Sequence, residues 1–168
     1  MIDSEGYRLN VGIIICNTEK QVLWARRIGQ DAWQFPQGGI CQDESPEDAL
    51  YRELKEEIGL LPEHVELVDQ IDRWLHYKLP RHMIRHGQKP LCIGQKQRWF
   101  LLKLVAHEDA IKLADSEKPE FDDWQWVDFW HPLSEVVPFK RKVYETALTE
   151  FEATVIALAS QGNQALPR

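Results

Sequence analysis

The arrangement of apolar and polar positions predicts a sheet built from short strands. Residues 11–16 form a short, apolar, β-branched run, which is typical of a buried strand. Residues 17–20 have the composition of a turn, and residues 21–25 return as the partner strand of a hairpin. Further strands are expected at residues 65–73, at residues 96–105 and, as an edge strand of alternating apolar and polar positions, at residues 124–127.

Two stretches carry the spacing of helices. The first, residues 46–58, follows Ser45, which can cap free N–H groups, has Pro46 at its first position, and precedes Gly59, which can end a helix in the left-handed conformation. Its apolar positions recur every four residues, at Leu50, Leu54 and Ile58. Residues 139–160 also repeat apolar positions at helical spacing. Residues 78–96 and 106–119 are predicted to be loops.

Length and composition fit one domain. The chain has 168 residues, of which 43% are apolar, enough for a single core. We expect one domain over residues 1–160 and a polar, disordered tail at residues 161–168. No apolar run is long enough to cross a membrane, no signal-peptide pattern opens the chain, and the three cysteines show no C-x-x-C spacing. These features predict a cytoplasmic protein with reduced thiols, which we expect to be a monomer.

Charge is unevenly distributed along the chain. The formal net charge of −7 and the pI near 5.4 are not those of a protein that coats nucleic acid along its length. Residues 73–107, however, contain eight Lys or Arg and no Asp or Glu. Such asymmetry suggests a local anion site that faces an acidic site elsewhere in the chain. The alternative is an ordinary basic surface loop.

The acidic site is predicted on the first helix. At about 100° per residue, Glu53, Glu56 and Glu57 share a face that is separate from the apolar stripe. Three neighbouring carboxylates repel one another unless a cation lies among them, and oxygen ligands suit a hard cation such as Mg²⁺. Arg52 stands one turn from Glu56, where it can hold a carboxylate in place. The alternative is a solvated acidic face.

A glycine pair upstream of the helix, which can let a backbone approach phosphate, completes a recognisable motif. Gly38, five residues, Glu44, seven residues, Arg52-Glu53-Leu54, one residue, Glu56-Glu57, one residue and Gly59-Leu60 resemble the Nudix box, whose nine fixed positions over 23 residues are all filled here. The resemblance implies an α/β fold, namely an α/β/α sandwich with a mixed sheet and a loop–helix–loop at the box. It also implies hydrolysis of a nucleoside diphosphate linked to another group, with Mg²⁺ as cofactor and Mn²⁺ or another divalent cation as a substitute.

The same resemblance implies roles for individual residues. The metal ligands would be Glu53, Glu56 and Glu57, with Gly38 and, from outside the box, Glu120. The catalytic residues would be Glu53, Glu57 and Arg52, with Glu53 first as the base that deprotonates the attacking water and Glu57 and Glu120 next. The identity of the base stays open, and the acids at residues 122–123 compete with Glu120 as the outside carboxylate.

Segments outside the box narrow the resemblance. They are GYRLNVG at residues 6–12, WQFPQGG at 33–39, KLP at 78–80, IGQKQ at 93–97 and PEF at 119–121, and they look like the bacterial RNA 5′-pyrophosphohydrolase family. This resemblance implies removal of pyrophosphate from the 5′-triphosphate end of RNA, which leaves a 5′ monophosphate and starts mRNA decay. No DNA and no membrane partner is expected.

The RNA-family resemblance also implies a set of substrate-binding residues. The phosphates and the first nucleotides would be held by Arg8, Arg27, Gln34, Lys78, Gln95 and Lys140, and the second base by Val137 and Phe139. The family often has Ser at position 32, and Ala32 here lacks the hydroxyl for one phosphate contact.

Other functions stay open at this point. Hydrolysis of diadenosine tetra- or pentaphosphate uses the same metals and a similar groove. A non-catalytic module that binds RNA 5′ ends would have a degraded box, whereas this box is intact. A zinc site at His76, His82 and His86 is disfavoured because Pro80 and Gly87 interrupt the stretch and no cysteine or acidic ligand stands beside it.

Overall fold

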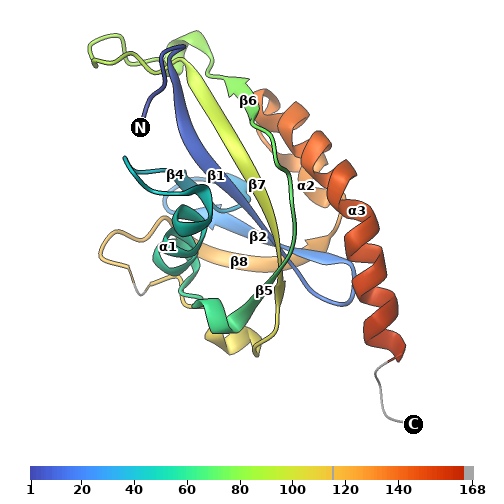
Figure 1. Ribbon diagram of the computed structural model, residues 1–168. Helices are drawn as coiled ribbons and strands as arrows, with labels where there is room; N and C mark the ends of the chain where they lie inside the picture. The colour runs from blue at the N-terminus through green and yellow to red at the C-terminus, as the bar shows by residue number, and fades with distance from the viewer. Residues whose placement is uncertain (115, 165–168) are drawn as a thin grey trace.

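In the part of the chain that the computed structural model describes, residues 1–114 and 116–164, eight strands form one mixed sheet between two helices (Figure 1). Helix α1 (Pro46–Ile58) covers one face of the sheet and helix α3 (Arg141–Gln164) covers the other. This architecture confirms the predicted α/β/α sandwich. The strands are β1 (Tyr7–Cys16), β2 (Gln21–Arg27), β3 (Trp33–Gln34), β4 (Gln37–Gly39), β5 (Val65–Gln70), β6 (Leu75–Lys78), β7 (Gly94–Leu104) and β8 (Phe121–Asp128).

Strands β1 and β7 are the parallel centre of the sheet, paired from Tyr7 and Gly94 to Cys16 and Lys103. Strand β4 pairs with β1 around Val11, and β6 pairs with the first residues of β7. Strands β4 and β6 therefore flank the same half of the central pair. The glycine pair of the box, which belongs to β4, is thereby fixed to the same half of the sheet as β6, with β1 and β7 between them.

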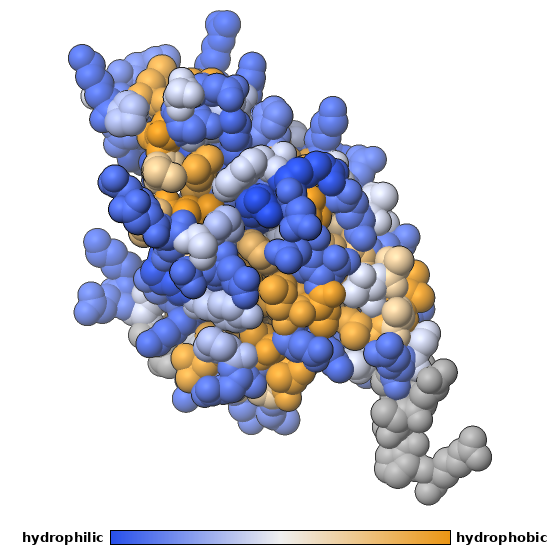
Figure 2. All heavy atoms as spheres, viewed as in Figure 1, coloured by the Kyte–Doolittle hydropathy of each residue, from blue (hydrophilic) through white to orange (hydrophobic). Residues whose placement is uncertain are grey.

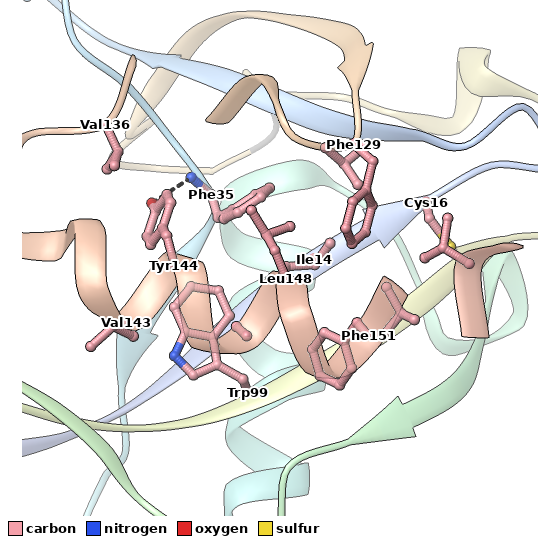
Figure 3. Close-up of a cluster of buried hydrophobic side chains, with 14 of the residues drawn as sticks. Ile14, Cys16, Phe35, Trp99, Phe129, Val136, Val143, Tyr144, Leu148 and Phe151 are labelled. Atoms are coloured by element: carbon pink, nitrogen blue, oxygen red, sulfur yellow. Dashed lines mark hydrogen bonds between the residues drawn. The ribbon is translucent and has the colours of Figure 1, made fainter. Parts of the chain in front are cut away.

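Two apolar cores follow from the alternation of side chains along β1. Ile14 points toward α3, where it packs with Phe35, Trp99, Tyr144, Leu148 and Phe151 (Figure 3). Ile13 and Ile15 point to the opposite face and join the predicted apolar stripe of α1. The stripe is fully buried, so the glutamates on the other face of α1 are free to serve a site.

Helix α1 begins and ends where the sequence predicts. The Asp48 N–H donates to Ser45 Oγ at 3.1 Å, which satisfies one of the free donors of the first turn. Gly59 has φ 77° and its N–H donates to the Lys55 carbonyl at 3.0 Å. A Cβ at position 59 would lie 2.4 Å from the Lys112 carbonyl oxygen, so both the conformation and the space require glycine.

Several strand boundaries differ from the prediction because pairing across the sheet sets them. β6 and the start of β7 fall in or beside the stretch expected to be a loop, and the four residues of β6 take their conformation from the ladder with β7. β1 starts at Tyr7 because it pairs with β7 from that residue onward. β5 ends at Gln70 and remains paired with β7 to that residue, after a register shift between Leu67 and Asp69.

The C-terminal helices also differ from the prediction. Pro138 begins a 3₁₀ turn (Pro138–Lys140), so α3 starts only at Arg141. α3 continues to Gln164, so residues 161–164 of the predicted tail are helical, and residues 165–168 lie outside the described part. The short helix α2 (His131–Glu135) was not expected, since five residues carry no helical period. Within the described residues, no helix is both long and apolar enough to cross a membrane.

Candidate active site

Arg52 links helix α1 to the loop before it through hydrogen bonds. Its guanidinium donates twice to Glu44, from Nε and Nη2, both at 2.8 Å, and from Nη2 to the Gly39 carbonyl at 2.7 Å. It also donates from Nη1 to Glu53 at 2.7 Å and to Glu56 at 3.3 Å. The bidentate pair lowers the pKa of Glu44 to about 2. Arg52 thus positions the loop and two carboxylates.

The glycine loop touches the Glu53 carboxylate directly. A Cβ at Gly38 would lie 1.9 Å from Glu53 Cδ and 2.2 Å from Oε2, so any side chain at position 38 would displace one of the two. At Gly39, by contrast, a Cβ would meet no atom within 4 Å. The first glycine of the pair is therefore required by the site, and the second is not required by space.

Four carboxylates gather beside this contact. Glu53 and Glu57 are buried, and both line a cavity with Glu120, which lies immediately before β8. Burial raises the pKa of Glu53, although Arg52 opposes the effect. Burial, together with the charges of Glu53 and Glu120, raises the pKa of Glu57 well above its ordinary value. Glu56 borders the same carboxylates from a neighbouring hollow.

These residues fit a hard divalent cation. Glu57 Oε2 is buried and has no hydrogen-bond partner among the described residues, and the nearby carboxylates repel one another. A cation among them would supply both the missing partner and the missing charge, and all the donors are oxygens. As the side chains stand, no three His, Cys, Asp or Glu side chains of the described residues already converge on one point, since Arg52 engages Glu53 and Glu56.

The cavity continues from the carboxylates to a buried cation. Lys140 is 7% exposed, and its Nζ donates to Gln34 Oε1 at 3.4 Å and to Gln37 Oε1 at 3.3 Å. Burial, and then the charge of Arg27, lower the pKa of Lys140 to about 8, while Glu57 opposes the shift. Lys140 forms no ion pair with any described residue. A buried ammonium without a carboxylate partner is suited to binding an anionic ligand.

Beyond Lys140 the wall becomes apolar. The Lys140 Nζ lies 5.9 Å from the centroid of the Tyr77 ring, and that ring packs against Phe139 with centroids 5.6 Å apart. Leu79 and Met83 complete this part of the wall with Val137. The groove thus passes from carboxylates, through amides and cations, to an apolar surface that suits a flat ring. Its volume of about 460 Å³ is that of a site for a small ligand or the end of a larger one.

Most of the predicted site residues meet in this groove. It is lined by Arg27, Gln34, Gly38, Glu53, Glu57, Gln95, Glu120, Val137, Phe139 and Lys140, and by Ala32, which lacks the hydroxyl of a serine. Arg52 and Glu56 line the adjoining hollow, which shares Glu53, Glu57 and Glu120 with the groove.

Two predicted phosphate ligands, Arg8 and Lys78, do not line the groove. Lys78 directly follows Tyr77, whose ring faces the groove, so the alternation along β6 turns Lys78 to the other face of the sheet. Arg8 pairs with Gln95 and shares its face of the sheet, but its side chain is exposed. The roles of Arg8 and Lys78 in binding stay predictions.

Sequence reasoning missed part of the groove wall. Tyr77, Leu79 and Met83 were not proposed, although the alternation of apolar and polar residues from Leu75 to Leu79 was a signal for the first two. Tyr144 was also missed. Its buried hydroxyl accepts a hydrogen bond from the Phe35 N–H at 3.0 Å, and so fixes the segment between Gln34 and Gln37 (Figure 3).

Comparisons with known proteins agree with this geometry. Residues 6–147 match the family model described as NUDIX domain. The chain is 62% identical over 151 residues to the RNA pyrophosphohydrolase of Hahella chejuensis (strain KCTC 2396), covering 90% of this chain and 94% of that protein. It is 58% identical over 163 residues to the RNA pyrophosphohydrolase of Shewanella loihica (strain ATCC BAA-1088 / PV-4), covering 97% and 94%.

Solved structures share the fold at low sequence identity. The E. coli dihydroneopterin triphosphate pyrophosphohydrolase superposes with a TM-score of 0.64 and 22% identity, covering 86% of this chain and 98% of that one. A C. elegans Ap4A hydrolase in a binary complex superposes with a TM-score of 0.63 and 18% identity, covering 88% and 98%. At these identities the likeness concerns the arrangement of strands and helices alone.

Proposed function

The chain belongs to the NUDIX family, and from that premise we propose that it is an RNA pyrophosphohydrolase, which converts a 5′-triphosphate end of RNA to a 5′ monophosphate. The observation that carries the proposal is the combination, in one groove, of the buried carboxylates Glu53 and Glu57 with Lys140, a buried cation that has no carboxylate partner among the described residues. The groove therefore suits a polyanion whose reacting phosphate lies at the carboxylates and whose nucleotides, with their phosphates, extend past Lys140 toward the apolar wall. Relatives of at least 58% identity that are named for this activity support RNA as the substrate.

The chemistry needs a metal that the carboxylates fit. Glu53, Glu56, Glu57 and Glu120 would hold divalent cations, for which we propose Mg²⁺, with Mn²⁺ as a substitute. Bound there, a cation neutralises charge on the phosphoryl oxygens and lowers the pKa of a water molecule. Arg52 keeps Glu53 and Glu56 oriented through its hydrogen bonds.

Individual residues of the chain then have separate roles in the reaction. A glutamate of the cluster accepts the proton of the attacking water, whose oxygen bonds to the α-phosphorus while the α–β anhydride bond breaks. The departing pyrophosphate carries away the electron pair of that bond, while Arg27 and Lys140 offset charge on the phosphates that remain on the RNA. Gln34 and Gln95 offer amide donors to the phosphates. The apolar wall of Val137 and Phe139 receives a base.

The product would be RNA with a 5′-monophosphate end, the form that favours attack by a 5′-end-dependent ribonuclease. On this proposal the enzyme initiates mRNA decay in the cytoplasm, where its substrate is made.

One experiment separates this function from its rival. A single preparation with Mg²⁺ is given triphosphorylated RNA, diadenosine tetraphosphate and a nucleoside triphosphate, and kcat/KM is measured for each. We expect the RNA to exceed the nucleoside triphosphate by about tenfold or more, because contacts to further nucleotides add binding energy in the transition state. Faster hydrolysis of diadenosine tetraphosphate than of RNA would instead identify a dinucleoside polyphosphate hydrolase.

A further inference from the structure

The loop between β6 and β7 carries a cluster of basic side chains that the groove does not use. We call residues 80–92 the basic loop. It contains no acidic residue, and its basic side chains, all exposed, are Arg81, His82, Arg85, His86 and Lys89. Figure 1 shows it projecting from the end of the sheet where β6 and β7 lie beside the start of β1, and Figure 2 shows hydrophilic side chains extending from this end.

Three of the five Lys and Arg side chains elsewhere in residues 73–107 are neutralised by ion pairs. Arg73 pairs with Glu150 at 2.8 Å, and Arg98 lies 3.5 Å from Asp72. Lys96, beside the base of the loop, forms ion pairs with Asp3 at 2.8 Å and with Glu5 at 3.0 Å. Arg81, Arg85 and Lys89, in contrast, form no ion pair or side-chain hydrogen bond with any described residue. The basic loop therefore carries three of the five Lys and Arg side chains of residues 73–107 that form no ion pair with a described residue, the other two being Lys78 and Lys103.

The basic loop borders the apolar part of the groove. Leu79 and Met83 both line the apolar part of the groove, and Arg81 lies between them on a 3₁₀ turn (Arg81–Met83). The turn is held by the Met83 N–H, which donates to the Pro80 carbonyl at 2.9 Å, and the loop is closed at its base by the Leu79 N–H, which donates to the Ile93 carbonyl at 2.9 Å. A chain leaving the groove past its apolar wall therefore meets Arg81 first.

The surface on the other side of the apolar wall is less positively charged. Arg141 and Lys142 follow Lys140 there, but they share a surface hollow with Glu145 and Glu150. Acidic side chains in the same hollow reduce the attraction for a polyanion. The acid-free side is the side of the basic loop.

We propose that the basic loop binds the phosphates of the RNA chain downstream of the nucleotides that occupy the groove. The inference rests on the proposed function and extends it, since it assigns to Arg81, Arg85 and Lys89 a surface for the body of the RNA. A flexible single strand brings one phosphate per nucleotide, and exposed Arg and Lys side chains bind such a strand without reading its sequence. A free nucleotide or a dinucleotide has no phosphate downstream of the nucleotides that occupy the groove.

The test compares RNA lengths across salt concentrations. The triple variant Arg81→Gln/Arg85→Gln/Lys89→Gln is measured with a triphosphorylated dinucleotide and with a triphosphorylated, unstructured RNA that begins with the same two nucleotides and is about twelve nucleotides long. A matched control, Lys20→Gln/Lys103→Gln/Lys112→Gln, removes the same charge away from the groove. Melting temperatures of all three proteins verify that the variants are folded.

We expect the loop variant to lose about tenfold in kcat/KM on the longer RNA at about 50 mM salt and less than about twofold on the dinucleotide. The dependence of log kcat/KM on log salt should become shallower by about 2 for the longer RNA, since each lost phosphate contact removes about 0.7. The control should behave as wild type.

Three results would overturn the proposal. Equal losses on both substrates would mean that the loop acts on the groove itself. If the loop variant kept the wild-type kcat/KM on the longer RNA, or if the control variant lost as much, the surface would be merely solvated or would bind an acidic protein. Failure of the proposed function looks different, because the wild-type protein would then hydrolyse neither RNA while cleaving diadenosine tetraphosphate.

Discussion

Gly38 and Glu53 are in contact across the gap between the glycine loop and helix α1, so closely that a Cβ at position 38 would lie 1.9 Å from Glu53 Cδ. The box thus contains a steric requirement as well as a set of ligands. The backbone of the loop and a carboxylate of the helix occupy adjoining space, and a methyl group between them would move one of the two.

This contact predicts unequal effects of two adjacent substitutions. Gly38→Ala should lower kcat by about a hundredfold, because a displacement of about 1 Å at a catalytic group has effects of that size. Gly39→Ala is the matched control and should stay near wild type, since its Cβ would meet nothing within 4 Å. Steady-state kinetics on triphosphorylated RNA measure both. Similar activity in the two variants would contradict the steric explanation.

Glu57 should oppose the stability of the metal-free protein. Its raised pKa means that the folded state disfavours the charged form, so this destabilisation is absent at low pH and fully present above the raised pKa. Glu57→Gln should therefore raise the melting temperature near neutral pH in the absence of divalent cations, yet lower turnover by at least about a hundredfold. It should also reduce the increase in melting temperature that Mg²⁺ gives to the wild-type protein.

Glu56→Gln is the control for that experiment, because the Glu56 side chain is 53% exposed. It should not raise the melting temperature. If Glu57→Gln were less stable than wild type without metal, the burial argument for a cation site would be wrong.

The ion pair of Glu44 with Arg52 predicts a pH-dependent contribution to stability. The pKa of Glu44 falls from 4.5 to about 2 on folding, so the stabilisation is present above the unfolded value and is lost as the pH falls through the folded value. Glu44→Gln should therefore lower the free energy of unfolding at pH 7, and the difference from wild type should shrink as the pH approaches 2. Urea denaturation at several pH values measures it. The exposed Glu63→Gln should show no such difference.

The lowered pKa of Lys140 predicts that kcat/KM declines at alkaline pH. Burial and Arg27 lower its pKa to about 8, so the free enzyme loses this cation as the pH rises through that value. We expect kcat/KM, which reports groups of the free enzyme, to decline above a pH of about 8. Lys140→Arg keeps the charge and should move the decline to higher pH, although the longer side chain lowers the rate. An unchanged limb in Lys140→Arg would assign the decline to another group.

Phe139 should distinguish RNA from a free nucleotide. Phe139→Ala removes a stacking surface, an effect of about 1–3 kcal/mol, and should erase most of the expected tenfold advantage of RNA over a nucleoside triphosphate. Hydrolysis of the mononucleotide should hardly change. Phe139→Leu keeps the apolar wall without the ring and should fall between the two. Equal losses on both substrates would mean that Phe139 only supports Tyr77.

The helix and the carboxylates of the box could be predicted from the sequence because they depend on residues that are close together in the chain. Ser45, Gly59 and the stripe at Leu50 and Leu54 determine where α1 begins, ends and packs, and these are interactions within one helix and its two ends. The carboxylate cluster follows, since three of its members are one turn apart or less. Only Glu120 comes from elsewhere, and the Ile28 N–H, which donates to the Glu120 carbonyl at 3.0 Å, holds it beside β2.

The far wall of the groove could not be predicted in the same way. Tyr77 and Leu79 reach the groove because β6 pairs with β7, and Lys78 turns away from it for the same reason. A strand of four residues has too weak a pattern to be recognised alone, and the face that each side chain takes depends on the register with its partner. Resemblance named Lys78 as a ligand, but the register decides its orientation.

The central pairing of β1 with β7 also orders events while the chain is being synthesised. The buried Gln97 amide donates to Asn10 Oδ1 at 2.9 Å across a sequence separation of 87 residues, so β1 has no parallel partner until β7 has left the ribosome. The box emerges much earlier, and its helix can form, but Glu120, Phe139 and Lys140 are still to come. A nascent chain therefore displays the whole motif well before it has a groove, and the enzyme acquires activity only when its last helix folds back onto the sheet.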